Sequence, residues 1–171
     1  MFVKMKNIFK ATTFIPPNVQ LFIKNNLLFI KGPLGSVCLD LNPLKKIFLG
    51  TRKKKIVYST IFRLFQKNLL GVCLRYVVRL SFVGIGFRVE AIEKGFIKLK
   101  LGFSHFVFVK IPPYIRVFAP KKTVLVVESI DDQLLKEFCA RLQSLKAPDA
   151  YKGKGILYKN QTVILKEGKK K

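Results

Sequence analysis

The chain shows one pattern twice, a series of short strands followed by one long helix, and this repeat most strongly limits the folds open to it. In the first half, residues 19–24 and 27–31 are two mostly apolar runs on either side of Asn25-Asn26, which is typical of a hairpin with a tight turn. A turn at 32–35 follows. The pattern then predicts a strand at 36–41, a strand pair at 47–50 and 55–59, and a helix over roughly 61–79.

The second half repeats this order. Its strands are predicted at 87–92, 96–101, 105–111, 115–118 and 123–128, again ahead of a helix. Gly32 and Gly102, and likewise Pro43 and Pro112, take equivalent places in the two halves. The sequence therefore predicts an α/β protein of the α+β type with two tandem similar domains, residues 1–82 and 83–171. Each domain is an antiparallel sheet with one main helix packed on it, and residues 1–15 form an extended start.

The second helix has a clear apolar face. Its apolar side chains fall within an arc of roughly 140° at 100° per residue, which predicts that this face packs into the core; they are Leu134, Leu135, Phe138, Cys139, Leu142 and Leu145. Ala147-Pro148 is expected to end the helix, since the residue before proline disfavours the helical conformation. The loop that follows should therefore be held in place by a packed helix.

The charge points to a polyanionic partner. The chain has 33 Lys and Arg against 9 Asp and Glu, a formal charge of +24. Residues 1–82 contribute +14 and residues 83–171 contribute +10, so both halves are basic. Such a charge opposes compaction unless an anion neutralises it, which favours nucleic acid first and an anionic membrane surface second. The sequence has no apolar run long enough for a transmembrane helix, and its N-terminus is a poor signal peptide.

Pro148-Asp-Ala-Tyr151-Lys152-Gly153-Lys154-Gly155-Ile156, called the glycine–lysine loop below, carries the residue types expected for binding nucleic acid. Lysine supplies a mobile positive charge for phosphate oxygens, and tyrosine supplies a face for stacking. Glycine allows close approach of the backbone and can offer its N–H group as a donor. A flexible surface turn is the alternative interpretation of this stretch.

A second basic feature lies on the first predicted helix. Arg63, Lys67, Gly71, Arg75 and Arg79 are spaced by four and would form one stripe. Like charges at this spacing repel, so the stripe faces either an anionic partner or plain solvent.

The sequence motifs do not indicate a catalytic site or a metal site. Gly84-Ile-Gly86-Phe-Arg88 lacks the third glycine and the strand-then-helix order of a dinucleotide site, and it reads as a bend. Ser104 and His105 adjoin one another without an orienting acid, so a contact to RNA or a bond within a strand connection is preferred. The cysteines, Cys38, Cys73 and Cys139, lie far apart among apolar neighbours, which predicts buried, reduced thiols. We therefore expect no cofactor, no metal and no enzymatic activity.

Several motifs resemble the universal large-subunit ribosomal protein family L6, bacterial type. They are Ile30–Gly35, Phe82–Arg88, Leu101–His105, Ile130-Asp131 with Gln133-Leu134, Tyr151–Ile156, and the terminal Lys-Glu-Gly-Lys-Lys-Lys run. The resemblance covers essentially the whole chain. This sequence departs from the family where Pro148-Asp-Ala stands in place of Pro-Glu-Pro, and its first domain is richer in Phe and Lys.

The resemblance implies two α/β domains that bind large-subunit ribosomal RNA near the factor-binding region, by the sarcin–ricin loop and stalk base, together with neighbouring ribosomal proteins. It implies that Tyr151, Lys152, Gly153, Lys154 and Gly155 contact the RNA. The residues expected to join them are Ser104, His105, Lys146, Tyr158, Lys159, Lys166, Lys169, Lys170 and Lys171, with Arg63, Lys67, Arg75, Arg79 and Arg88 as further candidates. Abundant Phe, Ile and Lys suggest an AT-rich, organelle-encoded gene and a mitochondrial ribosome, with a plastid or bacterial source as the alternative.

Overall fold

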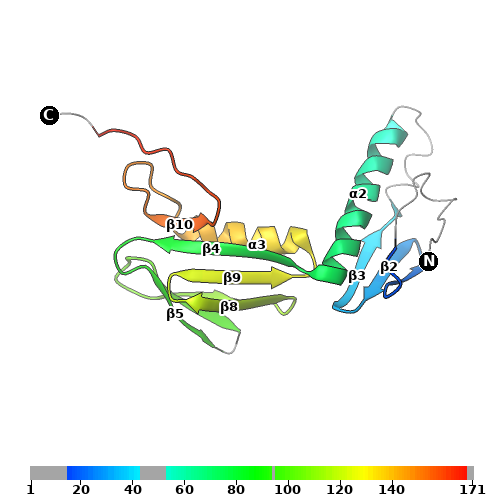
Figure 1. Cartoon of the computed structure of the whole chain (residues 1–171), viewed down its shortest axis with the longest axis horizontal. Helices are drawn as coiled ribbons and strands as arrows, with labels where there is room; N and C mark the ends of the chain where they lie inside the picture. Colours follow the sequence, from blue (N-terminus) through cyan, green and yellow to red (C-terminus); the bar gives the residue numbers. More distant parts are fainter. Residues whose placement is uncertain (1–14, 43–52, 94, 169–171) are drawn as a thin grey trace. The chain divides into compact units, whose positions relative to one another are not determined.

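The computed structural model describes residues 15–42, 53–93 and 95–168, which form two compact units (Figure 1). The first unit contains the residues up to Arg75 together with Ile130–Asp132, and the second contains Tyr76–Ser129 and Gln133 onward. Both units combine antiparallel sheets with one long helix, which confirms the predicted α+β class and tandem plan.

The first unit is a three-stranded sheet with one helix on it. Strands β1 (Gln20–Lys24), β2 (Leu27–Gly32) and β3 (Gly35–Asp40) pair antiparallel in that order, and helix α2 spans Lys53–Leu74. Asn25 and Asn26, with φ of 50° and 62°, form the predicted tight turn of the first hairpin. The core holds Leu28 and Ile30 of the sheet against Phe65 and Val72 of the helix.

The predicted extent of this helix is wrong at both ends. Residues 55–59, predicted as a strand, belong to α2 instead, while the partner strand predicted at 47–50 lies outside the described residues. Tyr58 stacks on Phe62 one turn later, with ring centroids 6.5 Å apart, so helical contacts outweigh the β propensity of this stretch. At the other end, Arg75 adopts a left-handed conformation with φ of 57° and stops the helix.

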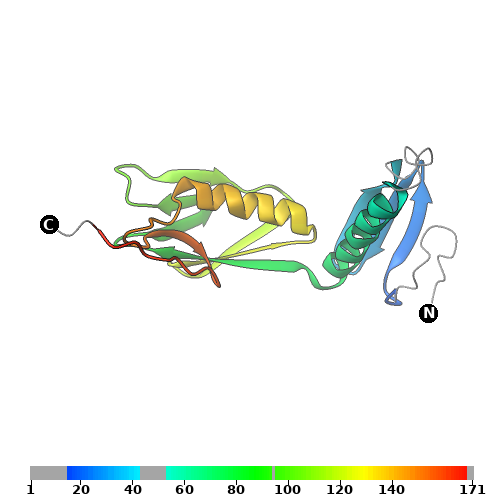
Figure 2. The ribbon, with the colours of Figure 1, turned by 90° about the horizontal axis from the view of Figure 1, so that it is seen from above.

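The second unit holds two sheets and a helix (Figures 1 and 2). Strands β5 (Arg88–Glu93), β6 (Phe96–Lys100) and β7 (Val107–Lys110) form a three-stranded sheet. The four-stranded sheet has the order β10-β4-β9-β8, from Gly155–Tyr158, Tyr76–Val83, Val124–Ser129 and Ile115–Lys121. Helix α3 (Asp132–Leu145) completes the unit.

The five strands predicted here are present, whereas β4 and β10 are additions that the sequence interpretation missed. Residues 76–79 were assigned to the first helix, but the β4 segment alternates in exposure and lies between β9 and β10. Arg79 therefore projects from a strand, and the five-residue basic stripe does not exist as one helical face.

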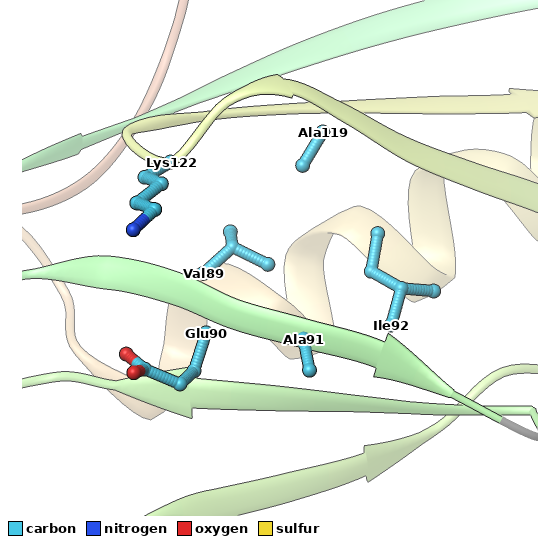
Figure 3. A pocket seen from close by; sticks show the side chains of 6 residues that line it. All are labelled: Val89, Glu90, Ala91, Ile92, Ala119 and Lys122. Atoms are coloured by element: carbon cyan, nitrogen blue, oxygen red, sulfur yellow. The ribbon is translucent and has the colours of Figure 1, made fainter.

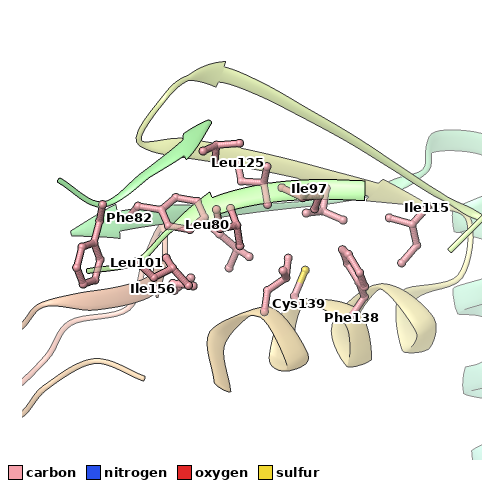
Figure 4. Packing of buried hydrophobic residues seen from close by; sticks show 14 of the residues in the cluster. Leu80, Phe82, Ile97, Leu101, Ile115, Leu125, Phe138, Cys139 and Ile156 are labelled. Atoms are coloured by element: carbon pink, nitrogen blue, oxygen red, sulfur yellow. The ribbon is translucent and has the colours of Figure 1, made fainter. Parts of the chain in front are cut away.

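The core of the second unit lies between α3 and the sheets. Phe138 and Cys139 point from the helix toward the strands that carry Leu80 and Ile97 (Figure 4). Leu135, Phe138, Cys139 and Leu142 are buried, as the apolar arc predicted, and Leu145 packs at the edge of the same cluster. Leu134, also predicted to lie in this arc, is only half-buried. Helix α3 is thus fixed against the sheets, and its C-terminal end positions the chain that follows. Within the described residues, no helix is long and apolar enough to cross a membrane.

Candidate nucleic-acid interface

The glycine–lysine loop is clamped at its base between α3 and β10. The Ile156 N–H donates to the Lys146 carbonyl at 2.9 Å, and the Gln143 side-chain amide donates to the Ile156 carbonyl at 3.3 Å. Gly155 lies opposite Val83, in the pairing of β10 with β4. Both ends of the loop are therefore attached to regular structure.

Asp149 organises the interior of the loop. Its carboxylate accepts from the Tyr151 N–H at 3.1 Å and the Lys152 N–H at 3.2 Å. Its own N–H donates to the Lys154 carbonyl and its carbonyl accepts from the Gly153 N–H, each at 2.9 Å. These four bonds give the loop a defined shape, and sequence reasoning did not assign Asp149 any role. The available signal was that an aspartate readily bonds backbone N–H groups two or three residues later.

The two glycines allow the backbone conformation of this loop. The Gly153 N–H is used inside the loop, where it donates to the Asp149 carbonyl. Gly153 has φ of 66° and Gly155 has φ of 151°, in a region that L side chains rarely adopt. A Cβ at Gly155 would lie 2.7 Å from the Pro148 Cα, so the backbone approach here requires glycine.

The loop presents its cationic and aromatic side chains outward. Lys152 is exposed, Tyr151 is 60% exposed, and Lys154 is half-buried. The segment after β10 returns to the loop, since the Lys166 N–H donates to the Ala150 carbonyl at 2.9 Å, and Lys166 itself is exposed. Exposed Lys159 follows β10, with its N–H bonded to the Arg79 carbonyl. The predicted contacts Lys169, Lys170 and Lys171 lie outside the described residues.

Lys146 links the loop to an aromatic cluster on the connection between β6 and β7. Its ammonium lies 4.9 Å from the Phe103 ring centroid, and Phe103 stacks on His105 with centroids 5.8 Å apart and planes 16° apart. The ammonium of Lys98, on β6, lies 4.2 Å from the ring centroid of Phe106, which belongs to the same connection. The structure therefore brings His105 and Lys146 together, as neighbours through Phe103. Ser104, which lies between Phe103 and His105 in the sequence, is exposed.

Phe103, Phe106 and Lys98 are candidate binding residues that sequence reasoning missed. Phe103 and Phe106 are each 39% exposed, although large aromatic side chains usually bury most of their surface. Their position on both sides of Ser104-His105 was the signal that could have identified them. Exposed rings beside ammonium groups are suited to stacking on nucleobases near phosphate.

Arg88 and Tyr158 are less open to a partner than the loop. The Arg88 Nε donates to Glu90 Oε2 at 2.6 Å. This hydrogen bond and the attraction of the opposite charges lower the pKa of Glu90 and raise that of Arg88. Tyr158 is half-buried against the core, and burial, followed by the nearby Cys139, raises its pKa. In the first unit, Arg63 and Lys67 are exposed on α2, with Lys67 3.2 Å from the Asp132 carboxylate, and Arg75 ends the helix.

The cysteines differ from the expected uniform burial. Cys139 is buried, Cys73 is half-buried, and Cys38 is exposed because it points to the side of the first sheet opposite α2. The three thiols are free. Across the described ranges, no three His, Cys, Asp or Glu side chains are grouped in a way that could hold a metal ion.

A shallow hollow lies between β5 and β8 (Figure 3). It is lined by Val89, Glu90, Ala91, Ile92, Ala119 and Lys122. The carboxylate that lines this hollow, Glu90, is bonded to Arg88.

Comparison with known proteins agrees with this architecture. The sequence model of the family described as Ribosomal protein L6 matches residues 83–159. The large ribosomal subunit protein uL6m of Reclinomonas americana is 34% identical, over 92% of this chain and 95% of that protein. The uL6 proteins of Dichelobacter nodosus and Buchnera aphidicola are 33% and 30% identical, each over 98% of this chain and their full length. Because the similarity extends over nearly the whole of each protein, the chain belongs to the ribosomal protein L6 family.

Proposed function

We propose that this protein is a structural constituent of the large ribosomal subunit, in which its second unit binds ribosomal RNA near the factor-binding region. The observation that carries the RNA-binding role is the ordered glycine–lysine loop. Its backbone N–H groups at Tyr151, Lys152 and Gly153 are used internally, so its shape does not depend on the partner. Binding then costs little ordering entropy, and the lysine side chains remain for phosphate contacts.

The aromatic cluster extends this surface. Lys146 belongs both to the base of the loop and to the Phe103–His105 pair, so phosphate-binding and base-stacking groups adjoin. The proposal includes neighbouring ribosomal proteins as further partners and no catalytic step. We also propose a mitochondrial ribosome as its location; the mitochondrial relative supports this, and similarly related bacterial proteins make a bacterial or plastid ribosome the alternative.

The RNA-binding role is tested by the salt dependence of affinity for a large-subunit ribosomal RNA fragment. Replacing Lys152 and Lys154 by alanine should reduce the slope of log affinity against log salt by about one unit per lost phosphate contact. The charge-matched control replaces Lys110 and Lys121, which are exposed on β7 and β8 and lie outside the loop. Equal slopes for the two double variants would remove the loop from the binding site.

The ribosomal role is tested by sedimentation of a tagged copy in an organelle lysate at moderate salt. Comigration with the large subunit, lost after ribonuclease treatment, is the expected result. Sedimentation with membranes regardless of ribonuclease would instead favour the membrane-surface alternative.

A further inference from the structure

The three-stranded sheet of the first unit has one covered face and one open face. Alternate residues of its strands point toward α2, and Leu28, Ile30 and Leu39 are buried there with residues of that helix. The intervening residues point to the opposite face, where Phe22, Lys24, Lys31 and Cys38 are exposed. Side chains of successive residues alternate across a sheet, so these outward residues share one surface.

Strand register arranges this open face in rows. Phe22 lies opposite Phe29, and Phe29 lies opposite Cys38, which gives one apolar row across all three strands. The rings of Phe22 and Phe29 are stacked, with centroids 5.1 Å apart and planes at 10°. Phe22 is nevertheless 50% exposed, at the edge strand, so the stack remains open to a further planar group.

A row that contains a lysine flanks this apolar row on each side. One contains Gln20, Lys31 and Ser36, and the other contains Lys24, Asp40 and the half-buried Leu27 between them. The two lysines thus lie on opposite sides of the aromatic pair, each two residues along its strand, or roughly 7 Å. The Asp40 carboxylate accepts from the Asn42 N–H at 2.8 Å, so this acid has a local partner.

This pattern fits an unpaired nucleic acid strand better than a protein. A stable protein interface needs an apolar core many residues wide with few charges in it. Here the apolar surface is one row of three residues with Leu27 beside it, and it lies between lysines. A single strand needs only an exposed aromatic face for a base and cations nearby for its phosphates. The strongly basic first half of the chain, at +14 over residues 1–82, favours the same partner.

We propose that the open face of β1–β3 is a second RNA-binding surface, on which an unpaired base stacks against Phe22 while Lys24 and Lys31 contact the adjoining phosphates. The surface lies in the first unit and is distinct from the glycine–lysine loop. It therefore goes beyond the proposed function, and either surface can be tested without the other.

Cys38 supplies a native reporter at the end of the aromatic row. Its thiol is exposed, Cys73 is half-buried, and burial raises the pKa of Cys139 to about 11, so Cys139 stays a protonated, shielded thiol. The full-length protein is treated with a maleimide, with and without a saturating short oligouridylate, and modification of each cysteine is followed by peptide mass. We expect the oligouridylate to slow modification of Cys38 several-fold and to leave Cys73 unchanged.

Two variants make the test specific. In Phe22→Ala the oligouridylate concentration needed for half-protection of Cys38 should rise about tenfold, the loss expected for one base–aromatic stack. In Phe22→Tyr it should be unchanged, because a planar face is retained. The Lys152→Ala, Lys154→Ala protein should still show Cys38 protection, since the two surfaces are separate.

The proposal would be overturned by an unchanged Cys38 rate in the wild-type protein, by equal protection in Phe22→Ala, or by protection that disappears in the double lysine variant. None of them affects the salt-slope test of the glycine–lysine loop. Equal protection by a fully paired RNA duplex would also contradict stacking on an unpaired base.

Discussion

Replacing Asp149 by alanine distinguishes two physical explanations of how the glycine–lysine loop would bind RNA, because they predict opposite changes in RNA affinity. If only net charge mattered, removing an acid beside Lys152 and Lys154 would strengthen RNA binding. If the loop must be ordered, the same change would weaken binding, since the carboxylate accepts from the Tyr151 and Lys152 N–H groups. The structure favours the second outcome.

The expected size follows from the bonds that are lost. Losing two hydrogen bonds, each worth about 1 kcal/mol, destabilises the ordered loop by about 2 kcal/mol. If a bound phosphate lies roughly 7 Å from the Asp149 carboxylate, removing this negative charge strengthens binding by about 0.6 kcal/mol in water, and by less in salt. The net loss is about 1.4 kcal/mol, which corresponds to about tenfold weaker binding.

Asp149→Asn is the matched control. It removes the same charge, but its amide oxygen still accepts one of the two backbone N–H groups. Titration of a labelled ribosomal RNA fragment by fluorescence anisotropy should therefore rank the proteins in the order wild type, Asp149→Asn, Asp149→Ala, with equal salt slopes for the two variants. If both variants bind more tightly than wild type, the loop does not depend on Asp149 and the reasoning is refuted.

Three further predictions concern the second unit. Gly155→Ala should lower the free energy of unfolding, measured in urea, by more than about 2 kcal/mol, because the new Cβ meets the Pro148 backbone. Gly86→Ala is the control: a Cβ there has no atom within 4 Å, so this change should cost only about 1 kcal/mol for the φ of 75°. Leu142→Ala should cost about 2–5 kcal/mol by the same measurement, since it leaves a cavity under α3. Arg88→Ala should raise the pKa of Glu90, measured by NMR titration, toward its ordinary value. Because this pKa is lowered on folding, the pair stabilises the protein above the unfolded-state pKa, and that contribution is lost as pH falls through the folded-state pKa.

The parts of the fold that depend only on residues close together in the sequence were predicted correctly. Asn25-Asn26 tolerates the positive φ of a tight hairpin turn, so the first hairpin was predictable. The buried face of α3 was predictable as well, because the helical period alone decides which of its side chains share one face. These elements match the sequence interpretation closely.

The elements that were missed depend on distant partners. Strand β4 follows α2 with only Arg75 between them, and no glycine or proline marks the end of the helix. Its strand conformation is stabilised by pairing with β9 and β10, which a local window does not contain. Strand β10 is only four residues long and directly follows the loop, so its periodicity is too short to identify.

The site divides in the same way. The lysines and Tyr151 of the candidate site are proposed from residue type alone, since side-chain chemistry is visible in the sequence. The bonding role of Asp149, the internal use of the Gly153 N–H, and the contact of Lys146 with Phe103 are properties of the folded loop. They could be found only once α3, β10 and the β6–β7 connection were placed.

The pairing of β4 with β10 has a consequence for how the second unit is made. Ser81 bonds to Leu157, 76 positions further along the chain, so the sheet that anchors the glycine–lysine loop is closed by one of the most sequence-distant contacts in the unit. Contacts of this separation form late and slow folding, because the intervening chain must first lose its freedom. During synthesis, β4 emerges long before β10 and has an unpaired edge in the meantime. The glycine–lysine loop is therefore expected to be acquired late, so the RNA binding that we propose for it would wait until the unit that supports the loop has folded.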